Sequence, residues 1–595
     1  MAQSMSSPPP ALAARGSQGI ILKETSGSRL ESTISGSECR VMEFSSDGCQ
    51  LAWCDGKSVT VMDVPSGAVK YTISKPKTRC IQFSPLGSYL ALWEPYAVTK
   101  DVPAGTPNLH VYNSSGELVT EYIQKKQQGW CPQWTEDEQV CARNVTNEVH
   151  CFSGGAPGLT CDNKLQIAGL TTYALSRGKL PYKIVVYVPG SKGAPCFVRM
   201  FAYPNLNASA IMASRSFYKS DTVSFSWNKK GSAVLVTTTT EVDKTGASYY
   251  GEQGLHYVSA RGESNMVQLS KKGPIYDVDW NPNSEEFCVV YGFMPAKATI
   301  FNCKCDPVYD FGTGHRNMAK YNPHGNILCL AGFGNLRGNI DLWDRESLKP
   351  IKKLEASDST QFEWCPDGVH FVTATTAPRL RVGNGYKVWH FCGTLVQCED
   401  TPPKQELWEV KWRPFPAGTF PTPSTSSTAP PTTIEQPVQQ EKKAAYRPPA
   451  LRGKPYTYKL HEEEPPQRVG AAEEKEKDKL SKSAQKNKKK RESKLKSKEQ
   501  EQVVITRGSK RGAEKDDALA LAAQILRGNK DKVVDPVGSG KSDSEKKLKN
   551  LRKKLTQIEQ LKQQQAEGKQ LETNQIEKIK TEQSILEEIE KLTLS

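Results

Sequence analysis

Tryptophan and cysteine are absent from the sequence after residue 412. All 11 tryptophans lie between Trp53 and Trp412, and all 16 cysteines lie between Cys39 and Cys398. A segment that lacks both and is rich in Lys, Glu, Gln and Ser cannot bury much apolar surface. The sequence therefore predicts a folded region that ends close to Trp412, followed by a tail that is extended or forms isolated helices.

The cysteines also lack the spacing of a disulfide framework or a zinc site. The closest pair is Cys303 and Cys305, and no CxxC occurs. We therefore expect reduced thiols packed in a core, as in a reducing compartment. No run of about 18 apolar residues occurs, and residues 1–15 lack the apolar region of a signal peptide. These absences predict a cytoplasmic location and no membrane partner.

Motifs that carry catalysis are missing as well. Residues 537–542 resemble the end of a phosphate-binding loop, but Asp535 stands where that loop needs its first glycine. Neither a G-x-S-x-G elbow nor an H-E-x-x-H pair occurs. We expect no catalytic residue, no metal ligand, no cofactor and no small-molecule substrate, so an enzyme such as a propeller-containing hydrolase is the least favoured alternative.

The net charge of +15 is distributed unevenly along the 595 residues. Residues 441–595 hold 38 of the 80 basic and 26 of the 65 acidic residues, a net charge of +12. Residues 1–440 hold the remaining 42 basic and 39 acidic residues, a net charge of +3. An excess of positive charge of that size favours polyanions such as RNA.

An aromatic residue followed by a polar turn and an apolar strand recurs through the first 412 residues. For example, Phe44-Ser-Ser-Asp-Gly leads into Leu51-Ala-Trp53. We call these aromatic residues the anchors; they are Phe44, Phe83, Trp134, Tyr173, Trp227, Trp280, Tyr321, Trp364 and Trp412. Successive anchors stand 39 to 54 residues apart, which is the period of a four-stranded propeller blade.

This period predicts an all-β fold, a nine-bladed WD40-type β-propeller over residues 19–415, behind a flexible N-terminus of residues 1–18. A strand at or near Ile20-Ile21-Leu22 should complete the last blade and fasten the ring, because closure protects the sheet edges. Two β-sandwiches are the alternative, since their strands are also separated by frequent turns. Sandwiches do not repeat an aromatic-turn-strand unit at a fixed period.

Residues 416–542 are first rich in Pro, Ser and Thr and then in Lys and Glu. This composition predicts a mostly disordered linker, with a short helix near 514–527. One stretch with a stiff di-proline is a candidate docking peptide, although it can equally be plain linker: Tyr446, Arg447, Pro448, Pro449, Leu451 and Arg452. A basic run is a candidate RNA contact, a nuclear-import signal or a solvated stretch: Lys488, Lys489, Lys490 and Arg491.

The sequence pattern of residues 543–595 predicts a basic helical hairpin. Leucine and isoleucine recur at helical spacing from Leu548 to Leu561, Gly568 interrupts the pattern, and a second stripe runs from Leu571 to Leu592. A coiled-coil dimerisation helix is the alternative. The candidate ribosome-binding residues lie on the first arm: Lys546, Lys547, Lys549, Arg552, Lys553 and Lys554.

Several long strings in this sequence resemble the family of eukaryotic translation initiation factor 2A. They include residues 188–195, 243–252, 291–301, 330–338, 446–452, 460–466 and 568–575. The stretch around 471–540 matches the family poorly, so nothing is carried over to it.

The resemblance implies a nine-bladed propeller and a factor that directs initiator methionyl-tRNA to the small ribosomal subunit. The family is described as codon-dependent, GTP-independent and active on a limited set of mRNAs, with other initiation factors as further partners. The C-terminal hairpin is also similar to a ribosome-binding segment of a protein that partners the exon-junction core, which makes residues 546–554 the first choice for contact with ribosomal RNA. The rival interpretation is a WD-repeat scaffold in ribosome assembly or RNA processing.

Overall fold

The computed structural model describes residues 9–24, 32–35, 39–98, 105–191, 193–218, 220–240, 251–425 and 465–468, together with Ile558 and Gln583. The chain divides into two compact units, Met1–Leu480 and Ser481–Ser595. In the second unit the two described residues are helical and Ile558 is buried. The linker helix near 514–527 lies outside the described residues, as does the rest of the hairpin, and both stay predictions.

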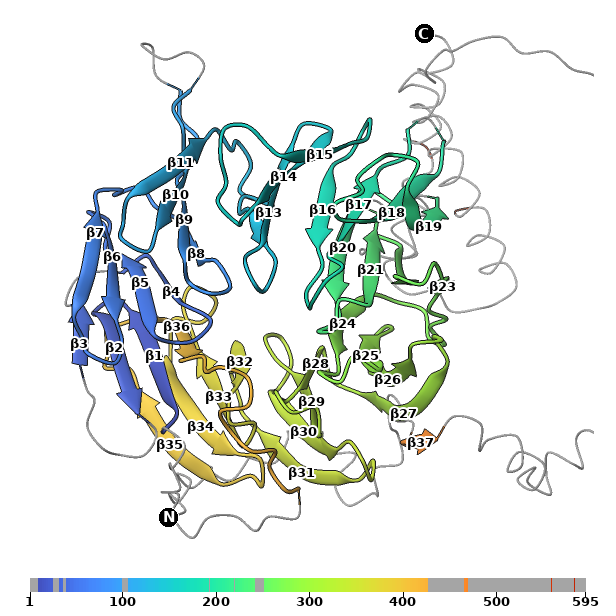
Figure 1. Ribbon diagram of the computed structural model, residues 1–595. Helices are drawn as coiled ribbons and strands as arrows, with labels where there is room; N and C mark the ends of the chain where they lie inside the picture. The colour runs from blue at the N-terminus through green and yellow to red at the C-terminus, as the bar shows by residue number, and fades with distance from the viewer. Residues whose placement is uncertain are drawn as a thin grey trace, which may run out of the picture. The chain divides into compact units, whose positions relative to one another are not determined.

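The first unit contains nine antiparallel sheets arranged as a ring of blades (Figure 1). This confirms the predicted all-β, nine-bladed propeller, and the described residues of this unit contain no helix. In blades 1 to 8 the strands pair in chain order. The first strands of neighbouring blades contact one another, so the first strand lies toward the centre of the ring and the fourth lies at its outer edge.

The first four blades follow one another along the chain. Blade 1 contains β4 (Val41–Phe44), β5 (Gln50–Cys54), β6 (Val59–Asp63) and β7 (Val69–Ile73). Blade 2 contains β8 (Cys80–Phe83), β9 (Tyr89–Trp93), β10 (Leu109–Asn113) and β11 (Leu118–Tyr122). Blade 3 contains β12 (Gln133–Trp134), β13 (Val140–Val145), β14 (Glu148–Ser153) and β15 (Asn163–Gln166). Blade 4 contains β16 (Thr172–Leu175), β17 (Lys183–Val188), β18 (Cys196–Ala202) and β19 (Ile211–Phe217).

Blades 5 to 8 repeat the same meander, and blade 6 gains a fifth strand from the tail. Blade 5 contains β20 (Thr222–Trp227), β21 (Ala233–Thr239), β22 (Gln253–Ser259) and β23 (Ser264–Met266). Blade 6 contains β24 (Ile275–Trp280), β25 (Glu286–Tyr291), β26 (Ala296–Asn302), β27 (Pro307–Gly314) and β37 (Gln467–Arg468). Blade 7 contains β28 (Met318–Tyr321), β29 (Ile327–Gly332), β30 (Asn339–Asp344) and β31 (Pro350–Glu355). Blade 8 contains β32 (Gln361–Trp364), β33 (His370–Thr375), β34 (Gly385–His390) and β35 (Leu395–Asp400).

Blade 9 joins the two ends of the propeller sequence. Its innermost strand is β36 (Leu407–Trp412), and β1 (Ala11–Gly16), β2 (Gly19–Glu24) and β3 (Ser32–Ser35) follow outward. Ile20-Ile21-Leu22 lies in this blade as expected, but the strand that pairs with β36 is β1. The prediction of a flexible N-terminus through residue 18 is therefore wrong for residues 11–16. Ala11, Leu12 and Ala13 are buried, a short apolar run that the Ser/Pro/Ala-rich composition concealed.

The anchors occupy the same place in eight of the nine blades. Eight of the nine are the last residue of a first strand, and Tyr173 is the second residue of β16. Three anchor indoles donate a hydrogen bond to the preceding blade, each to the carbonyl directly before that blade's anchor. The pairs are Trp280 to Ser226 at 2.9 Å, Trp364 to Lys320 at 3.2 Å and Trp412 to Glu363 at 3.2 Å. The recurring aromatic residue thus joins one blade to the next.

The hydrophobic core lies between blades and is divided among them. One cluster combines Tyr309 and Phe311 of blade 6 with Trp343 of blade 7, and another combines Leu12 of blade 9 with Val372 of blade 8. All 16 cysteines are free thiols, eight of them buried and eight partly buried. This agrees with the expectation of reduced thiols in a core.

The chain returns to the propeller after its last blade. The side chain of Arg413 donates to the Gly48 carbonyl at 2.9 Å, and Asn326 of blade 7 donates to the Pro423 carbonyl at 2.7 Å. Residues 416–425 therefore pack on the disc, although the sequence assigned them to the linker. Prolines prevent regular strands in this segment, so the sequence has no hydrophobic periodicity there that could predict these contacts.

Candidate functional site

None of the site residues predicted from the sequence lies in the described part of the chain. This holds for the docking peptide within residues 446–452, for the basic run at 488–491 and for the six cations within 546–554. Their roles stay predictions. The candidate site that the structure shows is on the propeller itself.

The turns between the first and second strands of the blades gather on one face of the disc, which we call the turn face. Contacts between consecutive turns define it. They join Ser46 to Pro85, Leu86 to Glu138, Asn281 to Gly325, Asn322 to Gly368 and Arg413 to Gly48. Turns that contact one another on a rigid scaffold form a surface on which the backbone keeps fixed positions.

Positive charge on the turn face is concentrated in the adjacent turns of blades 4 and 5. We call Arg177, Lys179, Lys229 and Lys230 the basic turns; all four side chains are exposed. Within the described part of the chain, Lys230 is the one member of the four that forms an ion pair, with Glu285 at 3.4 Å, and both of those side chains are more than half exposed. Exposed pairs of this kind are weak, so the four cations are available to an anionic partner.

Glycine is what allows these two turns to lie so close together. A Cβ at Gly178 would stand 2.7 Å from the Lys230 carbonyl oxygen, and a Cβ at Gly231 would stand 1.8 Å from the Arg177 carbonyl oxygen. Both glycines also have positive φ, at +84° and +60°, which other residues rarely adopt. The two backbones therefore pack directly against each other and bring their cations side by side.

A cavity of about 600 Å³ lies beside the basic turns, between the inner parts of blades 3 to 6. Arg177 and Lys229 line it from the basic side, and Glu136 and Asp279 supply negative charge. The cavity therefore presents both signs of charge to a partner. No group of three or more His, Cys, Asp or Glu that could hold a metal ion occurs among the described residues.

The centre of the ring is held by a repeated set of hydrogen bonds between first strands. At the internal joint, between blades 6 and 7, Asp279 accepts from the Tyr321 backbone N–H at 2.8 Å and Asp277 from the Ala319 N–H at 3.1 Å. Lys320 Nζ lies 3.0 Å from Asp277 and 3.7 Å from Asp279. Burial raises the pKa of Asp279 to about 6, although the Lys320 charge opposes this.

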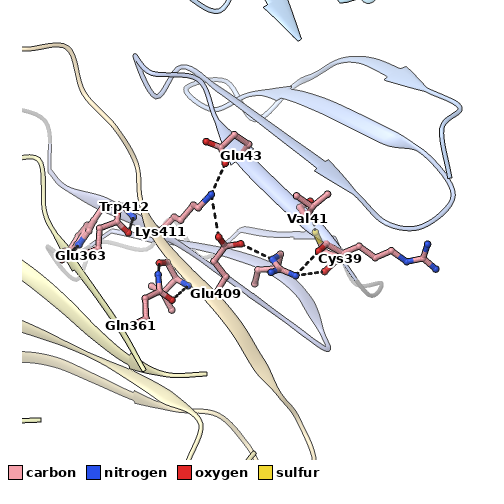
Figure 2. Close-up of polar contacts among 11 residues, drawn as sticks. Cys39, Val41, Glu43, Gln361, Glu363, Glu409, Lys411 and Trp412 are labelled. Atoms are coloured by element: carbon pink, nitrogen blue, oxygen red, sulfur yellow. Dashed lines mark hydrogen bonds and ion pairs between the residues drawn. The ribbon is translucent and has the colours of Figure 1, made fainter. Parts of the chain in front are cut away.

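The closing joint, between blades 8 and 9, has the same pattern (Figure 2). Glu363 accepts from the Trp412 backbone N–H at 3.4 Å, and Gln361 accepts from the Val410 N–H at 3.2 Å. Burial raises the pKa of Glu363 to about 7, helped by the negative charges of Glu409 and Glu43 and opposed by Lys411 and the Trp412 N–H. In both joints the accepting side chains stand one and three positions before an anchor.

Two cations extend the closing joint to blade 1 and to the N-terminal strand. Figure 2 shows Lys411 between Glu43 and Glu409, with Nζ–carboxylate distances of 2.6 and 3.3 Å. Arg15 pairs with Glu409 at 3.0 Å and donates to the carbonyls of Cys39 and Arg40. These side chains tie β36, β1 and the start of blade 1 together.

No sequence signal predicted the basic turns, because Lys and Arg are ordinary residues in solvated turns. A signal for the joints was present. Polar residues alternate with apolar ones directly before several anchors, as at Asp277 and Asp279 or at Gln361 and Glu363. That pattern marks side chains that face the centre of the ring.

The chain is similar to known proteins over nearly its whole length. Residues 215–410 match the family model of eukaryotic translation initiation factor eIF2A, and residues 546–592 match that of the eukaryotic translation initiation factor 2A C-terminal domain. Eukaryotic translation initiation factor 2A of Drosophila melanogaster is 37% identical over 642 residues, covering 98% of each chain. The same factor of Caenorhabditis elegans is 34% identical over 596 residues, covering 98% of this chain and 99% of that one.

A solved structure shares the fold. The crystal structure of a eukaryotic initiation factor superposes with a TM-score of 0.63 at 35% identity, covering 69% of this chain and all of that one. Among the described residues no helix is long and apolar enough to cross a membrane. From the matched family models and the near full-length identity, we conclude that this chain belongs to the eukaryotic translation initiation factor 2A family and is a translation initiation factor.

Proposed function

We propose that this protein directs initiator methionyl-tRNA to the small ribosomal subunit in a codon-dependent, GTP-independent way, for a limited set of mRNAs. It acts in the cytoplasm and without catalysis. Its partners are the small subunit, initiator tRNA, mRNA and other initiation factors. Membership of the family supports this role.

The observation that carries the proposal is the placement of the basic turns. Four exposed cations stand together on one face of a disc that is otherwise close to electrically neutral. Phosphate groups bind Lys and Arg mainly by charge, and each neutralised phosphate releases counterions. The back-to-back packing at Gly178 and Gly231 fixes the backbones of the turns that carry these cations, so binding requires little reordering of the backbone.

The tail supplies a second set of positive charges. Residues 441–595 carry a net charge of +12, and they are tethered to the disc through the same chain. Tethering raises the effective concentration of the second contact once the first has formed. The disc positions the partner, and the cations within 546–554 add affinity for ribosomal RNA.

Binding of the full-length protein to purified small subunits, initiator methionyl-tRNA and an AUG-containing mRNA tests the proposal. The test variant combines Arg177→Ala, Lys179→Ala, Lys229→Ala and Lys230→Ala. Loss of up to four phosphate contacts should weaken binding by at least about tenfold near 0.15 M salt, and the slope of log K against log salt should fall by up to about 4. A control variant removes as many exposed charges from or beside outer strands of other blades: Lys126→Ala, Lys164→Ala, Lys352→Ala and Lys353→Ala.

Equal weakening in the test and control variants would reduce the effect to net charge and contradict the role of the turn face. Replacing the six cations within 546–554 by Gln measures the contribution of the tail separately. Two further comparisons address the mechanism. Recovery of initiator tRNA on the subunit should need the AUG codon, and it should be the same with GTP, with GDP and without nucleotide.

A further inference from the structure

One outer strand of the propeller differs from the others. β27 is 8 residues long, and the other eight outer strands have 3 to 7 residues. Six of its eight residues are buried, and none is Lys or Arg. Several other outer strands carry basic residues, such as Lys70 in β7, Lys164 in β15 and Lys353 in β31. Basic residues and short length are what keep sheet edges from pairing with other strands, and β27 lacks both.

The side chains of β27 are already engaged within the disc. Asp310, its one charged residue, forms an ion pair with Lys297 at 2.7 Å, and both side chains are almost fully buried. Tyr309 packs against Phe311, and Phe311 packs against Trp343 of blade 7, each pair with ring centroids 4.9 Å apart. Pro307 and Val308 are exposed, and from Tyr309 onward the feature that β27 presents outward is its backbone.

A segment of the tail pairs with that backbone (Figure 1). β37 runs antiparallel to β27, with Arg468 opposite Tyr309 and Gln467 opposite Asp310. Pro465 and Pro466 directly precede β37. Proline has no backbone N–H, so the added strand cannot extend in that direction. The segment Pro465–Arg468 is exposed on its outer side, as an added edge strand should be.

We propose that the outer edge of blade 6 is an acceptor site for an added β-strand, and that its occupant in the free protein is this chain's own segment Pro465–Arg468. Backbone hydrogen bonds give the recognition, as in other cases of strand addition. The propeller sequence ends in blade 9, at Trp412. Because Pro465–Arg468 docks at blade 6, the Lys/Glu-rich stretch that follows starts from blade 6 rather than from blade 9.

The proposal is independent of tRNA or ribosome binding, and hydrogen–deuterium exchange of the full-length protein tests it. One variant combines Gln467→Pro with Arg468→Pro, which removes whichever of the two backbone N–H groups faces β27. The matched control combines Gln467→Ala with Arg468→Ala, which keeps both donors and removes both side chains. Exchange in β27 is compared with exchange in β31, the outer strand of blade 7, in the same samples.

The proline pair should raise the exchange rate of the β27 amide that donates to β37, at Tyr309 or Asp310, by about tenfold, because the two backbone bonds of the hydrogen-bonded residue pair are lost. The alanine pair should stay within about twofold of the parent, since the backbone pairing is retained. Unchanged exchange of β27 in the proline pair would overturn the proposal. An equal increase in both variants would also overturn it, because the side chains rather than the backbone would then hold the segment.

Discussion

The internal joint between blades 6 and 7 and the closing joint between blades 8 and 9 share their hydrogen bonds but differ in what they join. Asp279 accepts from the Tyr321 N–H at one joint, and Glu363 accepts from the Trp412 N–H at the other. The closing joint adds Arg15 and Lys411, which reach Glu409 and Glu43. The repeat thus supplies one common joint, and closure of the ring reinforces it.

Chain entropy explains why closing the ring needs the added contacts to blade 1. The bond between Lys320 and Asp277 spans 43 residues and that between Trp412 and Glu363 spans 49, whereas Lys411 and Glu43, across blades 9 and 1, are 368 residues apart. Each doubling of a closed loop costs about 0.6 kcal/mol, so this ratio of about three doublings costs about 2 kcal/mol. Partly buried ion pairs can offset a cost of that size when their geometry is good.

The largest effect should follow from removing one anchor at the closing joint and one at an internal joint, that between blades 5 and 6, where Trp280 donates to Ser226. Trp412→Ala and Trp280→Ala should each lower the free energy of unfolding by about 3–5 kcal/mol, because both remove a buried indole and leave a cavity. Urea unfolding measures this loss. Only Trp412→Ala should also speed amide exchange in β1, since Leu12 lies opposite Trp412 in that pairing. Equal exchange of β1 in the two variants would remove the distinction between the joints.

Replacing the central lysine of each joint should have the next largest effect. Lys411→Met leaves Glu43 and Glu409 without their shared cation and should cost about 2–4 kcal/mol, toward the range for a broken buried pair. Lys320→Met should cost about 1–2 kcal/mol, because the Lys320 side chain is 39% exposed against 29% for Lys411. Chemical denaturation of both variants checks the order. A larger loss for Lys320→Met would contradict the view that closure depends more on its cation.

The pH dependence of the free energy of unfolding should reveal the contribution of Glu363 to the closing joint. Its pKa in the folded protein is raised to about 7, so the folded state binds a proton that the unfolded state has already released near pH 5. This contribution favours folding below the unfolded pKa and is lost as the pH rises through about 7. Glu363→Gln should therefore lose less stability between pH 5 and pH 8 than the parent, by about 1–3 kcal/mol.

Other groups change the parent's own profile, so the difference between parent and variant is the quantity to measure. Burial lowers the pKa of His256 and His390 to about 4, and their contribution grows as the pH rises toward their unfolded value. Asp279, with a pKa of about 6, acts in the same direction as Glu363. These terms are common to both proteins and cancel. Parallel pH profiles for the two proteins would show that Glu363 is ionised throughout this range.

The fold was predictable from the sequence because one recurring aromatic residue, the anchor, marks each blade. Eight anchors sit beside the turn that follows a first strand, and Tyr173 lies two residues before the end of its strand, so nine anchors still give nine blades. Strand β1 was missed because Ala11-Leu12-Ala13 is short and stands among serines, prolines and alanines. Its burial depends on β36, almost 400 residues away, and local composition cannot reveal such a partner.

The candidate site was harder to predict than the fold. Arg177 and Lys229 stand 52 positions apart in sequence, and only the packing of Gly178 and Gly231 brings their turns together. The pairing of Gln467 and Arg468 with β27 has no signal either, since a two-residue strand has no periodicity. The joints were closer to predictable, because their polar residues keep a fixed distance from the anchors.

The smallest effect on stability should come from the cations of the turn face, in contrast to those of the closing joint. Lys230 and Glu285 are 59% and 73% exposed, so Lys230→Ala should change the free energy of unfolding by less than about 0.5 kcal/mol. Urea unfolding of this variant beside Lys411→Met measures the contrast directly. A loss above about 1 kcal/mol would exceed the usual range for an exposed pair. Lys230 would then be a structural residue of the disc, and the basic turns would no longer be a surface left open for an anionic partner.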